Sequence, residues 1–70
     1  MFRSANVYWD DVTALARLLK ESHPDVPINE ISIGMVNKWV LELPQFRDDP
    51  ELVNDDILLA ILSEWIEEAS

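Results

Sequence analysis

Prolines divide the chain into three segments, and each segment carries an apolar stripe at helical spacing. Pro24, Pro44 and Pro50 stand between these segments. Proline lacks a backbone donor and clashes with the preceding turn, so it ends a helix rather than continuing it. The pattern therefore predicts helices over residues 11–22, 35–43 and 55–68. Their stripes are Val12, Leu15, Ala16 and Leu19; Val36, Trp39, Val40 and Leu43; and Ile57, Leu58, Ile61, Leu62 and Trp65.

Polar residues mark where these segments begin. Asp10 is the predicted N-cap of the first helix, because its carboxylate can accept from free backbone N–H groups. Asp49 directly before Pro50 predicts a short helical turn, and Asn54 is a second cap before the last helix. Residues 30–33 alternate polar and apolar side chains, and we expect at most a short extended piece there.

Three amphipathic helices with short connections predict an all-α fold. We expect a compact three-helix bundle, similar to a winged helix, with at most a vestigial extended segment. The chain is predicted to be a single domain over residues 1–70, in which residues 1–7 form a loosely ordered extension. Trp9, Trp39 and Trp65 are expected in the core, together with Phe46 from the loop after the second helix.

Acidic residues are concentrated in the carboxyl-terminal part of the chain. The whole sequence has 14 acids against 5 Lys and Arg residues, a net charge of −9. Residues 1–41 hold five acids and four bases, whereas residues 42–70 hold nine acids and one base, Arg47. A negative field repels nucleic acid and anionic lipid, and it attracts basic protein surfaces and metal cations. We therefore expect a positively charged protein partner, with no binding to nucleic acid or membranes.

The residue types that catalysis or a tight cofactor site needs are scarce. The chain has no cysteine, one histidine and one glycine, which leaves no thiolate metal site, no thiol nucleophile and no glycine-rich phosphate loop. No apolar stretch approaches the roughly 18 residues that a membrane-spanning helix needs. We predict a monomer in the cytoplasm that is not an enzyme and holds no tightly bound cofactor.

Seven carboxylates of the acidic part are predicted to form the partner surface. Three of them lie three or four positions apart on the last helix and are neighbours on its surface. A solvated helix face is the alternative interpretation for any single one of them. Leu59 and Ile66 lie off the main stripe, either at the edge of the core or as an apolar part of this surface. The seven are Asp48, Asp49, Asp55, Asp56, Glu64, Glu67 and Glu68.

Two sequence motifs stand out in the second half of the chain. They are F-x-D-D-P-x-x-x-N, which begins at Phe46, and A-I-L-x-x-W-x-x-E-A, which begins at Ala60. Together they resemble the IscX family, whose members are small acidic accessory proteins of bacterial iron–sulphur cluster assembly. The resemblance extends over residues 9–69. It includes Trp9 with Asp11, Pro24 with Asp25, and Trp39.

The resemblance implies an accessory adaptor or regulator of cluster assembly. Such a protein docks through an acidic surface onto a basic patch of the cysteine desulfurase, overlaps with frataxin for that enzyme and binds Fe²⁺ or Fe³⁺ weakly. Two alternatives stay open: a weak iron-binding or iron-donor protein, and a generic acidic interaction domain with another basic protein partner. The candidate iron ligands are Asp11, Asp48, Asp49, Glu67 and Glu68.

Overall fold

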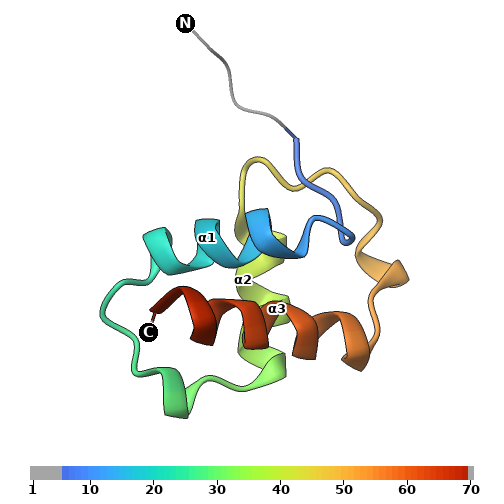
Figure 1. Cartoon of the computed structure of the whole chain (residues 1–70). Coiled ribbons are helices and arrows are strands. Elements are labelled where there is room, and N and C mark those ends of the chain that lie inside the picture. Colours follow the sequence, from blue (N-terminus) through green and yellow to red (C-terminus); the bar gives the residue numbers. More distant parts are fainter. Residues whose placement is uncertain (1–5, 70) are drawn as a thin grey trace, which may run out of the picture.

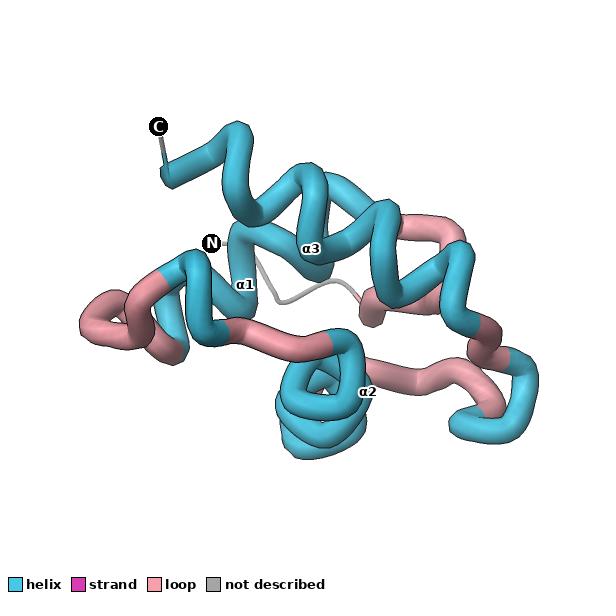
Figure 2. The backbone as a smooth tube through the Cα atoms, turned by 90° about the horizontal axis from the view of Figure 1, so that it is seen from below, coloured by secondary structure: helices cyan, strands magenta, loops and turns pink. Residues whose placement is uncertain are grey.

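Two helices lie side by side and a third crosses them in the computed structural model, which describes residues 6–69 (Figure 1). The helices are α1 (Val12–Ser22), α2 (Ile33–Glu42) and α3 (Asp55–Ala69). Two short 3₁₀ turns, η1 (Ile28–Glu30) and η2 (Pro50–Leu52), lie in the connections. α1 packs most extensively against α3, and α2 runs across them, so that it is seen end-on in Figure 2. The predicted all-α three-helix fold is confirmed, and no helix among the described residues is long and apolar enough to cross a membrane.

The second helix begins two residues before its predicted start. Ser32 is the N-cap of α2, and its hydroxyl accepts a hydrogen bond from the Met35 backbone N–H at 3.2 Å. This bond satisfies one of the backbone donors that a helix start leaves free. The extended piece predicted over residues 30–33 is limited to Ile31 and Ser32, whose backbones are extended, because Glu30 ends η1 and Ile33 is already helical.

The first helix has a different N-cap from the one predicted. Asp11, not Asp10, occupies the cap position of α1. Its carboxylate makes no bond to the helix and instead accepts from the Tyr8 backbone N–H at 2.9 Å, which closes a turn ahead of α1. The other two predicted caps are confirmed. Asn54 Oδ1 accepts from the Ile57 N–H at 2.9 Å, and Asp49 Oδ1 accepts from the Glu51 N–H at 2.9 Å.

The core is built from the predicted apolar stripes. Leu15 and Leu19 of α1 are fully buried, and so is Ile61 of α3. Aromatic rings close the end of the core where α1 finishes. The ring of Trp39 stacks on His23 with centroids 4.1 Å apart and meets Trp65 at 6.0 Å. Rings in this range add to the stabilisation that area burial supplies, so this stack fixes the end of α1 onto α2 and α3.

Extended pairing occurs at one point of the described chain, which lies outside residues 30–33. A single parallel bridge joins Val7 to Phe46 within residues 6–69. The Val7 N–H donates to the Gln45 carbonyl at 2.9 Å, and the Arg47 N–H donates to the Val7 carbonyl at 3.0 Å. Val7 is buried, so the core begins inside the range predicted as an extension, while residues 1–5 lie outside the described residues.

Removing a core side chain between α1 and α3 is expected to destabilise the whole domain. Leu15→Ala should lower the free energy of unfolding by about 3 kcal/mol, through lost burial and the cavity left behind. Leu41→Ala is the matched control, because Leu41 is exposed on α2. Urea denaturation followed by far-ultraviolet circular dichroism measures both. Equal, small effects would contradict the packing of α1 described above.

Candidate functional site

The carboxylate of Asp48 holds the turn before α1. Its Oδ2 accepts a hydrogen bond from the Trp9 backbone N–H at 3.0 Å, and its Oδ1 accepts from the Asp49 N–H at 2.7 Å. Both oxygens are therefore engaged in backbone contacts. Hydrogen bonds to an ionised acceptor are stronger than neutral ones, so Asp48 ties two distant segments together.

Asp49 adds a second tie between the same segments. Its backbone carbonyl accepts from the Trp9 indole N–H at 2.8 Å, while its side chain caps η2. A buried indole needs a partner for its N–H, and this carbonyl supplies it. The Trp9 ring also meets Phe46 edge-to-face at 4.7 Å. We call these contacts of Trp9 with Phe46, Asp48 and Asp49 the Trp9 clasp.

Two further predicted carboxylates stand free at the start of α3. Asp55 and Asp56 form its first turn and are exposed. Neither side chain makes a hydrogen bond or an ion pair with any described residue. Negative charge is stabilised at this end of a helix, where backbone N–H groups point outward. The fold therefore tolerates two adjacent charges here and leaves both carboxylates open to a partner.

The remaining predicted carboxylates lie at the far end of the same helix. Glu64 accepts a long hydrogen bond from the Thr13 hydroxyl at 3.4 Å, and Glu68 pairs with Arg17 at 3.4 Å. Glu67 is exposed and has no partner among the described residues. From Asp55 to Glu68 the helix rises by roughly 20 Å. The seven predicted residues therefore form two groups at opposite ends of α3 rather than one cluster.

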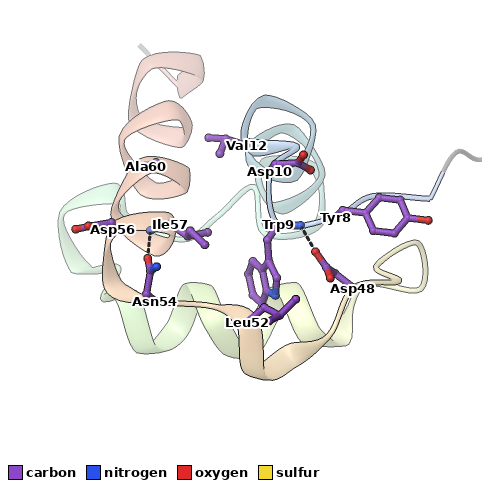
Figure 3. A pocket seen from close by; sticks show the side chains of 10 residues that line it. All are labelled: Tyr8, Trp9, Asp10, Val12, Asp48, Leu52, Asn54, Asp56, Ile57 and Ala60. Atoms are coloured by element: carbon purple, nitrogen blue, oxygen red, sulfur yellow. Dashed lines mark hydrogen bonds between the residues drawn. The ribbon is translucent and has the colours of Figure 1, made fainter.

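A cleft lies beside the Trp9 clasp, between the starts of α1 and α3 (Figure 3). It has a volume of about 810 Å³. Val12 and Ile57 point into it from the two helices, with Trp9 and Leu52 below them in the view. Ala60, Tyr8 and Asn54 complete the wall with three aspartates: Asp10, Asp48 and Asp56. The lining is thus apolar with an acidic border, and it contains no Lys, Arg or His side chain.

Residues 7–70 match the protein family described as iron–sulphur cluster assembly. The chain belongs to this family. A similar protein, an uncharacterised protein of Pseudomonas aeruginosa, is 42% identical over 60 residues, which cover 86% of this chain and 91% of that protein. The resemblance inferred from the two motifs is confirmed.

The five candidate iron ligands of this iron–sulphur cluster assembly protein do not come together. The carboxylates of Asp11 and Asp48 are engaged by backbone N–H groups of the turn before α1, whereas Glu67 and Glu68 lie at the end of α3. No three His, Asp or Glu side chains within residues 6–69 are gathered as a metal site requires. The arrangement therefore does not fit a preformed iron cage, and iron binding stays a prediction.

Sequence reasoning missed the cleft and Leu52, the more exposed of its two exposed large hydrophobic residues. Leu52 is 62% exposed, more than Leu59 or Ile66, which the helical pattern had singled out. Its position in a three-residue turn gives no periodicity from which a face could be predicted. Leu59 and Ile66 are exposed on α3, so they lie on its surface rather than in the core.

Removing the Asp48 carboxylate is expected to loosen the Trp9 clasp. Asp48→Ala should lower the free energy of unfolding by about 2 kcal/mol, because two backbone N–H groups lose a charged acceptor. Asp10→Ala removes an exposed carboxylate from the turn before α1, which Asp48 holds. This control should change the free energy of unfolding by less than about 0.5 kcal/mol. Chemical denaturation followed by tryptophan fluorescence gives both values. If Asp48→Ala leaves the free energy of unfolding unchanged, Asp48 does not hold the turn.

Proposed function

We propose that the protein is an accessory adaptor or regulator of iron–sulphur cluster assembly in the cytoplasm, and that it docks by an acidic surface onto a basic patch of the cysteine desulfurase. Membership of the assembly family supports the pathway. The partner and the mode of docking are supported by the charge: nine acids and one base over residues 42–70 attract a positively charged protein surface. We propose no catalytic step for this chain itself. Its role would overlap with that of frataxin, with which it would compete for the enzyme.

The free carboxylates carry this proposal. Asp55, Asp56 and Glu67 are exposed and have no partner among the described residues, so their charge is not neutralised within the fold. By contrast, Asp48 and Asp49 serve the Trp9 clasp, and Glu68 is paired with Arg17. Free charges at both ends of α3 favour an elongated contact along this helix. Such a contact accelerates association and loses strength as salt rises.

Neutralising the free carboxylates is expected to weaken binding to the desulfurase. A triple variant Asp55→Asn, Asp56→Asn and Glu67→Gln should bind about tenfold more weakly at low salt. This factor corresponds to a loss of about 0.5 kcal/mol of binding free energy for each exposed charge. The matched control removes three exposed charges elsewhere, by Asp25→Asn, Glu30→Gln and Glu42→Gln, and should change affinity by less than about twofold. Isothermal titration calorimetry measures each complex at several salt concentrations.

The same titrations contain the outcome that contradicts the proposal. Affinity of the unchanged protein should fall steadily between low salt and about 0.5 M sodium chloride. An affinity that does not change with salt concentration would contradict electrostatic docking. No binding to the desulfurase, together with capture of a different basic protein from a cell extract, would favour the generic acidic interaction domain instead.

Weak iron binding is part of the proposal, as attraction to free carboxylates rather than as a cage. Oxygen ligands suit hard cations, and no described cluster concentrates them. Titration with ferrous iron under anaerobic conditions, followed by nuclear magnetic resonance, should broaden the amide signals around Asp55, Asp56 and Glu67 gradually and together. Saturation at one equivalent, with broadening confined to Asp11 and Asp48, would contradict this and support the iron-donor alternative.

A further inference from the structure

We propose that the cleft beside the Trp9 clasp receives a large apolar side chain from a basic segment of the partner protein, an inference that rests on the proposed docking function. The cleft is separate from the far end of α3, where Glu64, Glu67 and Glu68 lie. It therefore adds an apolar contact to a surface that the sequence presents as electrostatic.

The shape and lining of the cleft favour an apolar side chain. Its volume of about 810 Å³ lies within the range of protein ligand sites, and Val12, Ile57 and Ala60 supply apolar surface from two helices. Leu52 at its border is 62% exposed, so most of its surface is in contact with solvent. An exposed leucine alone is ordinary, but here it adjoins an apolar hollow. An apolar side chain placed between them removes part of this surface from water.

The border of the cleft favours basic residues on either side of that side chain. Asp10 lies before α1 and Asp56 lies in α3, so the acidic border of the cleft comes from two elements; in Figure 3 the Asp56 carboxylate points outward from α3, away from Val12. Both are exposed and have no hydrogen bond or ion pair with any described residue. In a segment where leucine, methionine or phenylalanine adjoins lysine or arginine, the apolar side chain would pack in the cleft and the basic side chain would pair with the aspartates at its border.

The same border disfavours the other possible occupants. Phosphate groups of nucleic acid or anionic lipid would meet three aspartates and no base in the lining. A second copy of the chain would bring a net charge of −9 toward an equal charge. Charge complementarity thus selects a cationic protein segment.

Adding an acid at the cleft separates an apolar contact from a purely electrostatic one. If charge alone governed docking, Leu52→Glu would tighten binding to the proposed basic patch of the desulfurase, since it adds a negative charge. If the cleft receives an apolar side chain, Leu52→Glu should weaken binding by about tenfold, as loss of an anchor contact does. Leu41→Glu is the matched control: Leu41 is 43% exposed on α2, outside the cleft, and its replacement should not weaken binding.

Calorimetric titration of the purified cysteine desulfurase with the full chain and both variants gives the result, with thermal denaturation confirming that each variant is folded. Leu52→Ala should also weaken binding by a factor that is similar at low and high salt, because apolar contacts are not screened.

Binding by Leu52→Glu as tight as that of the unchanged protein would overturn this inference and leave the proposed function standing. A dimer of the unchanged protein that Leu52→Glu dissociates would assign the cleft to a second copy and overturn it too. No binding by the unchanged protein would remove the proposed function, and this inference with it.

Discussion

The contact between Trp9 and the segment at residues 48–49 determines how the two ends of the fold meet. Trp9 gives its backbone N–H to Asp48 and its indole N–H to the Asp49 carbonyl, while its ring packs on Phe46. These bonds place the turn before α1 against the turn that leads into α3. The start of α1 and the start of α3 consequently face one another, and the cleft is the space that this arrangement leaves open. Both the core boundary and the candidate site depend on Trp9, on the Asp48 carboxylate that accepts its backbone N–H and on the Asp49 carbonyl that accepts its indole N–H.

Helices and caps were predictable wherever one short stretch of sequence decides them. Apolar spacing located all three helices, and Asp49 and Asn54 cap as expected because each bonds to a residue only two or three positions away. Predictions failed where a polar group bonds outside the helix that it was expected to cap, or where the pairing partner is distant in sequence. Asp10 and Asp11 are equivalent as cap candidates in the sequence, but the turn at Tyr8 uses Asp11. The pairing of Val7 with Phe46 spans most of the chain and has no local pattern.

The same limit applies to the candidate site. Sequence counts charges but does not show which of them the fold neutralises or uses. Seven acids looked equivalent, yet Asp48 and Asp49 serve backbone donors. Glu64 accepts from Thr13 and Glu68 faces Arg17, which leaves Asp55, Asp56 and Glu67 without a partner among the described residues. The site residue that pattern analysis overlooked, Leu52, lies in a turn too short to have a periodicity. The structure therefore reduces the number of acids available to a partner and adds Leu52, an apolar residue, to the candidate binding surface.

Charge and apolar surface would contribute to different steps of docking. A net charge of −8 over residues 42–70 raises the rate at which a basic partner is encountered, but exposed charges hold a complex weakly once salt screens them. Apolar burial is insensitive to salt and mainly lengthens the life of a complex. A domain of 70 residues has little interior in which to build a binding site, so a shallow cleft at its surface is the available place for such a contact. The aspartates at the border of the cleft link the two steps, because the residues that attract a cationic segment also stand where its apolar side chain would enter.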